Sequence, residues 1–189
     1  MPEQTSSKEK PKGTTRDLKV PEGVTLTING SKVTAKGKKS EEKRDFPSIG
    51  IKMELKDNLF IVSSENSKRK TKARIGAIIS HVANMAKGAS EGFTYRLKAV
   101  HAHFPMTFKV QGNKFIVENF LGSKSTSEAV ILEGVKVEAK GADITVQSTD
   151  KEKAAQTAAN IERTTYIRNK DRRVFQDGVF LVERNGVPV

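Results

Sequence analysis

Hydrophobic and polar residues alternate along several short stretches of the chain, and this period of two predicts β-strands. The alternating stretches span residues 24–28, 33–35, 51–56 and 59–62. Asn29-Gly30 lies between the first two stretches and predicts a tight hairpin turn, because these residue types accept positive φ angles. The charged stretch 37–45 shows no such apolar alternation, so we interpret it as a loop.

The period then changes from two to that of an α-helix. Apolar residues form one stripe at helical spacing along residues 67–87, and Gly88 is expected to end the helix. The residues of this stripe are Ile75, Ile78, Ile79, Val82 and Met85. The first part of the chain therefore predicts antiparallel strands whose sheet is covered on one face by a single helix.

The second half of the chain repeats this order. The matching segments are 28–33 with 110–115, 51–56 with 135–140, and 59–63 with 144–148. A second amphipathic helix is predicted over 150–166, with Asp150 as its N-cap. The sequence therefore predicts an α+β fold of two tandem duplicated units, each an antiparallel sheet covered by one main helix.

These patterns divide the chain into four parts. Residues 1–16 are polar and rich in Lys, Ser, Thr and Pro, so we interpret them as a flexible basic tail. The first α+β unit is expected over 17–89 and the second over 90–166. Residues 167–189 have no counterpart after the first helix and form a basic C-terminal extension, in which Asp177-Gly178 predicts a turn.

Charge narrows the choice of partner. The chain has 34 Lys and Arg against 22 Asp and Glu, a net charge of +12, which favours a polyanion such as nucleic acid. It has no cysteine, so disulfides and thiolate metal sites are excluded. No stretch approaches the roughly 18 apolar residues of a membrane span, and the first residues resemble no signal peptide. We expect a soluble intracellular protein with no membrane partner.

Two patterns invite a chemical interpretation, and both fail on context. Gly88-Ala-Ser-Glu-Gly92 matches the nucleophile elbow of hydrolases, but Ser90 follows a predicted helix where the elbow requires a strand. His101 and His103 share a face of a predicted strand but lack further metal ligands beside them. We therefore expect no enzyme activity, no metal, no cofactor and no small-molecule substrate. A hydrolase that uses Ser90 stays an alternative, tested by serine-reactive labelling that Ser90→Ala abolishes.

Basic residues gather in four clusters. They comprise Lys8, Lys10 and Lys12; Lys38, Lys39, Lys43 and Arg44; Lys68, Arg69, Lys70, Lys72 and Arg74; and Arg168, Lys170, Arg172 and Arg173. The third, the first-helix cluster, places cations at the positive end of a helix dipole, which favours an anionic partner. The fourth, the C-terminal cluster, is the strongest RNA candidate, because arginine pairs well with phosphate and Phe175 and Phe180 offer stacking surfaces beside it.

Several segments resemble the archaeal and eukaryotic form of the L-six family of large-subunit ribosomal proteins. They are VPEGVTLTI (20–28), SHVANMAKG (80–88), EGFTYRLKAVHAHFP (91–105), ENFLG (118–122), QTAANIE (156–162) and RRVFQDGVFLVE (172–183). The last is the most specific, because an R-x-F-x-D-G motif followed by an apolar pair resembles the C-terminal motif of this family. The chain departs from the family pattern at Phe180, where Tyr is usual, and at Arg163, where an amide is usual.

The resemblance implies a duplicated α+β fold and a place in the cytoplasmic ribosome. It implies binding to large-subunit ribosomal RNA mainly through the second unit, near the sarcin-ricin loop and stalk base, where translational GTPases dock. Neighbouring large-subunit proteins are further implied partners. The motif nominates as RNA-binding residues Arg172, Arg173, Phe175, Asp177 and Gly178, with Arg168 and Lys170 just upstream.

We therefore expect an architectural protein that clamps RNA helices through phosphate and sugar contacts. Arginines would contact phosphates, Phe175 would pack on a sugar or base, and Asp177-Gly178 would fix the turn that presents them. The alternative outside the ribosome is a general nucleic-acid-binding architectural protein, which would bind duplex DNA as well as ribosomal RNA.

Overall fold

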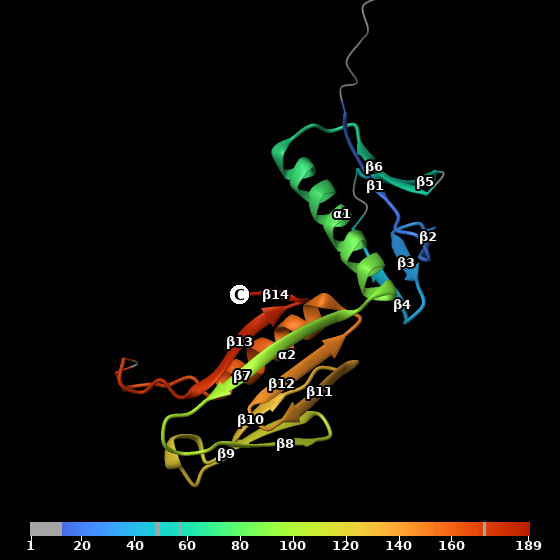
Figure 1. Ribbon diagram of the computed structural model, residues 1–189. Coiled ribbons are helices and arrows are strands. Elements are labelled where there is room, and N and C mark those ends of the chain that lie inside the picture. The colour runs from blue at the N-terminus through green and yellow to red at the C-terminus, as the bar shows by residue number, and fades with distance from the viewer. Residues whose placement is uncertain (1–12, 48–49, 57, 172) are drawn as a thin grey trace, which may run out of the picture. The chain divides into compact units, whose positions relative to one another are not determined.

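The computed structural model describes residues 13–47, 50–56, 58–171 and 173–189. The chain forms two compact units, the first ending at Ala86 and the second beginning at Lys87 (Figure 1). The boundary was expected after residue 89 and lies three residues earlier, after Ala86 and inside helix α1 (Arg69–Ser90). Most of the expected tail lies outside the described residues, but residues 14–16 belong to strand β1 (Thr14–Lys19) and not to a flexible tail.

The first unit holds two three-stranded antiparallel sheets and most of α1 (Figure 1). The sheets have the strand orders β2-β3-β4 and β1-β6-β5, with β2 at Thr25–Asn29, β3 at Lys32–Lys36, β4 at Glu41–Asp45, β5 at Lys52–Lys56 and β6 at Leu59–Ser64. Val33, Phe60 and Val62 from the sheets pack with Ile75 and Val82 from α1 in one buried core. The helical stripe thus covers the strands as the periodicity predicted.

Strand β4 corrects the interpretation of residues 37–45 as a loop. Glu41–Asp45 pairs antiparallel with β3, with Lys43 opposite Thr34. Glu42 and Arg44 are half-buried on one side of β4, and the neighbouring residues are exposed. The strand therefore alternates in burial but not in residue polarity. A search for apolar alternation could not detect it.

The hairpin turns of the two units share one backbone geometry. Gly30 has a φ of +63° and Gly112 a φ of +56°, and each is the first residue of a two-residue turn. Asn29 pairs with Lys32 as the last residue of β2, so the turn lies one residue later than predicted. A positive φ at the first turn position alone matches the type II′ hairpin, which strongly favours glycine there.

The second unit repeats the first and adds two strands. Its sheets have the orders β10-β9-β8 and β11-β12-β7-β13-β14, with β7 at Phe93–Val100, β8 at Thr107–Gln111, β9 at Lys114–Glu118, β10 at Ser127–Val130, β11 at Val135–Lys140, β12 at Asp143–Ser148, β13 at Gly178–Arg184 and β14 at Val187–Pro188. A short 3-10 turn occupies Phe120–Gly122. The strands β11, β12 and β7 occupy the places of β5, β6 and β1. The predicted duplication and α+β class are confirmed.

Helix α2 (Lys151–Thr164) packs its small and apolar side chains onto this sheet. Ala154, Ala158 and Ile161 are buried against the strands, and Asp150 caps the helix, its carboxylate accepting a hydrogen bond from the Glu152 N–H at 2.8 Å. The predicted cap is confirmed. Within the described residues, no helix is long and apolar enough to cross a membrane.

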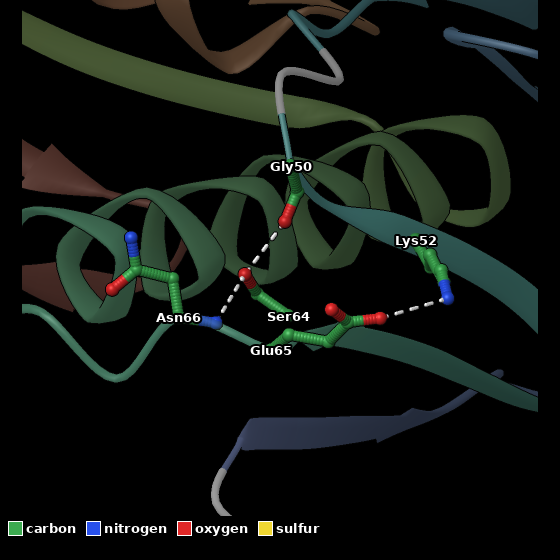
Figure 2. A network of polar contacts seen from close by, with 5 residues as sticks. All are labelled: Gly50, Lys52, Ser64, Glu65 and Asn66. Atoms are coloured by element: carbon green, nitrogen blue, oxygen red, sulfur yellow. Dashed lines mark hydrogen bonds and ion pairs between the residues drawn. The ribbon is translucent and has the colours of Figure 1, made fainter.

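One polar network is copied in both units. The Ser64 hydroxyl donates to the carbonyl oxygen of Gly50 at 2.6 Å and accepts from the backbone N–H of Asn66 at 3.2 Å (Figure 2). Ser148 makes the same pair of bonds to Gly134, at 3.0 Å, and to Asp150, at 3.2 Å. Each serine ties a residue just before one strand to the backbone just ahead of the following helix. The duplication therefore preserves the strand-to-helix junction as well as the elements.

Half of the C-terminal extension is part of the sheet. Strand β13 pairs antiparallel with β7, and Val179 is buried in the core of the unit. Asn185 then exchanges two hydrogen bonds of 2.8 Å with the backbone of Thr94. The segment that was expected to be an appendage thus adds an edge that the sheet of the first unit does not have in its described residues.

Candidate nucleic-acid interface

Residues 166–177 connect α2 to β13, and we call them the cationic loop. Both ends of the loop are held by buried polar side chains. The Thr165 hydroxyl accepts a hydrogen bond from the Val179 N–H at 2.9 Å and donates to the Glu162 carbonyl oxygen at 3.1 Å. A carboxylate oxygen of Asp177 accepts from the Ala102 N–H at 2.8 Å. The loop is therefore fixed both where it follows α2 and where it enters β13.

A tight turn shapes the middle of the loop. The Asp171 carboxylate accepts from the Arg173 N–H at 2.9 Å, and its carbonyl oxygen accepts from the N–H groups of Val174 and Phe175 at 3.1 and 3.0 Å. The Gln176 side chain donates to the Arg173 carbonyl oxygen at 3.0 Å. Local hydrogen bonds thus satisfy the backbone of a loop that has no strand partner.

The structure describes three of the four residues of the C-terminal cluster, and all three lie on this loop. Arg168, Lys170 and Arg173 are exposed, and the Lys170 ammonium lies 4.6 Å from the centre of the Phe175 ring. Arg172 lies outside the described residues. The loop therefore brings cations and an aromatic ring together, as the sequence predicted for this segment.

The roles predicted for Asp177 and Gly178 need correction. They do not form a turn: Gly178 is the first residue of β13 and pairs with Val100. Asp177 holds the loop to residue 102 instead. A Cβ at Gly178 would lie 3.1 Å from the Phe180 ring, so the absence of a side chain lets that ring lie against the strand. Asp177 thus holds the end of the loop, and Gly178 makes room for the Phe180 ring.

A cavity of about 600 Å³ opens beside the loop. Three aromatic side chains line it: Tyr166 is 56% exposed, Phe175 37% and Phe180 38%. Its polar lining includes Glu162, Arg163 and Gln176. Sequence reasoning missed Tyr166 and Arg163, because they follow the helical period of α2 and not the basic pattern. Their position at the junction between α2 and the cationic loop was the available signal.

Several cations on the strands of the second unit form ion pairs, whereas the described cations of the loop do not. Lys109 contacts Glu118 at 2.8 Å, Lys114 contacts Glu128 at 2.7 Å, and Arg96 contacts Glu183 at 3.1 Å. Among the residues that the structure describes, no carboxylate forms an ion pair with the side chains of Arg168, Lys170 or Arg173. The positive charges of Arg168, Lys170 and Arg173 are therefore not neutralised by ion pairs with the described residues.

The first-helix cluster lies on the first unit, at the start of α1. The Asn66 side chain accepts from the Lys68 N–H at 3.0 Å just before the helix, and the first turn of the helix holds no acidic residue. Arg69, Lys70 and Lys72 then extend from that turn with their charges opposed to the helix dipole. One turn later, Arg74 lines a cavity of about 300 Å³ with Arg44, Phe46 and His81.

The geometry does not support a hydrolase nucleophile at Ser90 or a metal site at His101 and His103. Ser90 is the last residue of α1, and its hydroxyl donates to the Lys87 carbonyl oxygen at 3.0 Å. His101 and His103 lie after β7, which ends at Val100, and not on a strand as expected. Within the described ranges, no group of three potential metal ligands comes together.

The chain is similar to known proteins over most of its length. The family model described as Ribosomal protein L6 matches residues 20–92 and 104–178. A relative from Aeropyrum pernix, named large ribosomal subunit protein uL6, is 48% identical over 168 residues, which cover 88% of this chain and 92% of the relative. Proteins of the same name from Sulfurisphaera tokodaii and Methanococcus vannielii are 41% and 40% identical, covering 89% and 90% of this chain and 91% and 93% of the relatives. The chain belongs to the ribosomal protein L6 family.

Proposed function

We propose that this protein is a structural constituent of the large subunit of the cytoplasmic ribosome, where it binds large-subunit ribosomal RNA near the sarcin-ricin loop and stalk base. It supports the region where translational GTPases dock, and it has neighbouring ribosomal proteins as further partners. Family membership supports the proposal, since the relatives are named as large-subunit proteins. Its role is architectural and not enzymatic.

One observation carries the RNA interface: Lys109 and Lys114 on the strands are paired with carboxylates, whereas the described cations of the cationic loop are not. Exposed ion pairs leave little charge for a partner, whereas Arg168, Lys170 and Arg173 keep theirs. RNA binding releases counterions for each phosphate that a cation neutralises, so clustered cations with no carboxylate partner favour binding. The loop is therefore the main contact.

The anchoring of the loop explains why it is an interface and not merely a charged segment. Thr165 and Asp177 hold its two ends, and Asp171 organises its middle. Such preorganisation lowers the entropy cost of ordering the loop on RNA. The first-helix cluster, with Lys68, Arg69, Lys70 and Lys72 on the other unit, supplies a second phosphate-binding patch.

The test compares two triple variants with equal loss of charge. The loop variant carries Arg168→Gln, Lys170→Gln and Arg173→Gln, and the control carries Lys109→Gln, Lys114→Gln and Lys140→Gln. Affinity for a large-subunit ribosomal RNA fragment is measured from 50 to 200 mM salt, values chosen to span the range in which phosphate contacts dominate. We expect the loop variant to bind more weakly and its log–log salt slope to fall by about 2–3.

The control variant is expected to change the slope by less than about 1, because its lysines are already paired with carboxylates. Equal effects of the two variants would show that net charge and not the cationic loop determines binding. Competition with duplex DNA separates the alternative function: a general nucleic-acid-binding protein would be displaced by DNA at the same concentration as by ribosomal RNA.

A further inference from the structure

We propose that the cavity beside the cationic loop receives one unstacked nucleotide of the bound RNA, its base lying against the aromatic rings. This inference rests on the proposed function and adds to it a contact that phosphate binding alone does not require. It assigns the cavity a ligand class, an unpaired nucleotide, and it predicts that this RNA is read partly through a base.

The lining of the cavity favours a flat aromatic ligand. Tyr166, Phe175 and Phe180 are each more than one-third exposed, whereas the aromatic rings of β7, Phe93 and Tyr95, are buried. Exposed aromatic rings that face one concavity lose contact with water when a base stacks on them. Proteins recognise unpaired RNA bases in this way.

The backbone that carries two of these rings is held before any ligand binds. Phe180 lies on β13, where Gly178 leaves room for its ring. Phe175 is fixed by the turn that Asp171 organises, and its backbone N–H donates to the Asp171 carbonyl oxygen at 3.0 Å. A base that enters therefore meets a surface that needs little rearrangement, which favours stacking over a loose apolar contact.

The size and polar groups of the cavity fit a nucleotide better than a bare phosphate. Its volume of about 600 Å³ lies within the range of pockets that enclose small molecules. Glu162 and Gln176 provide oxygen acceptors for the amino groups of a base, and Arg163 provides donors. The Lys170 ammonium lies 4.6 Å from the centre of the Phe175 ring, so a cation is next to one of the three aromatic rings.

The experiment first identifies the nucleotide and then removes its base. Ultraviolet crosslinking of the full chain to a large-subunit ribosomal RNA fragment is expected to join Tyr166 or Phe175 to one unpaired base. An abasic residue at that nucleotide is then combined with Phe175→Leu in a two-by-two comparison of affinities. Phe104→Leu serves as the control, because Phe104 is 43% exposed on the same unit but does not line the cavity.

We expect the abasic RNA and Phe175→Leu each to weaken binding by about 5- to 100-fold, and their combination to add less than about twofold. Tyr166→Leu should reproduce this pattern, so a folding defect of one variant does not decide the result. Multiplying effects, or no base crosslink at either ring, would overturn the nucleotide site. In that case a loop triple variant that still loses affinity leaves the proposed function standing, whereas absence of RNA binding by the wild-type chain overturns both.

Discussion

Asp177 accepts a hydrogen bond from the backbone N–H of Ala102 at 2.8 Å, and this bond connects two segments that are 75 residues apart. Asp177 is buried. It is the last residue of the cationic loop and directly precedes the first residue of β13. The same residue therefore contributes to the stability of the second unit and to the position of its proposed RNA-binding loop.

Asp177→Ala is expected to lower the free energy of unfolding by about 0.5–1.5 kcal/mol, because the partly buried bond from the Ala102 N–H is lost. Asp177→Asn keeps a carbonyl oxygen in the same place and should cost less. Urea unfolding of each variant measures the difference. Asp171→Ala is the matched control, since its bond to the Arg173 N–H is exposed; a loss as large as that of Asp177→Ala would contradict the anchoring role.

Two glycines of α1 are expected to respond in opposite directions to alanine. A Cβ at Gly88 would lie 2.0 Å from the Thr149 carbonyl oxygen and 3.0 Å from the Phe93 ring, so Gly88→Ala must displace the backbone. It should lower the free energy of unfolding by about 1–3 kcal/mol. A Cβ at Gly76 meets only the Arg16 side chain, at 3.5 Å. Gly76→Ala should therefore stabilise the helix by up to about 1 kcal/mol. Thermal unfolding of both variants distinguishes the two cases.

The copied serine networks predict a graded loss. Ser64→Ala leaves the carbonyl oxygen of Gly50 and the N–H of Asn66 without the hydroxyl, in a buried site, and should cost about 1–3 kcal/mol. Ser148→Ala should cost less, because its site is more exposed and its bond to Gly134 is longer. Hydrogen exchange in the first turns of α1 and α2 reports each loss locally. The exposed Ser67→Ala is the control, and a reversed order of the two losses would contradict the argument.

Tyr95 predicts a loss of stability at high pH. Burial raises the pKa of its phenol above the usual value, and Arg184 opposes this only in part. The folded state therefore favours the neutral phenol, so its contribution is complete below about pH 10 and is lost as the pH rises through the folded pKa. Tyr95→Phe should remove this step from the pH dependence of unfolding. Because the chain has two tyrosines, Tyr166→Phe leaves Tyr95 as the sole tyrosine signal in absorbance titration and serves as the control.

Sequence periodicity predicted those elements whose burial follows residue polarity. The stripe of Ile75, Ile78 and Val82 and the cap at Asp150 lie where they were expected, because apolar contact and a capping carboxylate are local properties. The duplication was detectable for the same reason. Strand β4 was not, since its two half-buried residues, Glu42 and Arg44, are charged.

The cationic loop shows what the sequence could and could not indicate about the site. Its charges are visible in the sequence, but their lack of carboxylate partners in the described residues depends on which strands pair. The role of Asp177 depends on residue 102, and the role of Gly178 depends on the Phe180 ring. Such contacts arise from tertiary structure, so a local turn propensity gave the wrong geometry for Asp177-Gly178.

The most direct test of the central claim is crosslinking in cells, with both the nucleotide and the amino acid of each crosslink identified. We predict crosslinks from residues 166–177 to large-subunit ribosomal RNA near the sarcin-ricin loop and stalk base. Crosslinks of this loop mainly to other RNA or to DNA, or ribosomal crosslinks that leave the loop untouched, would contradict it.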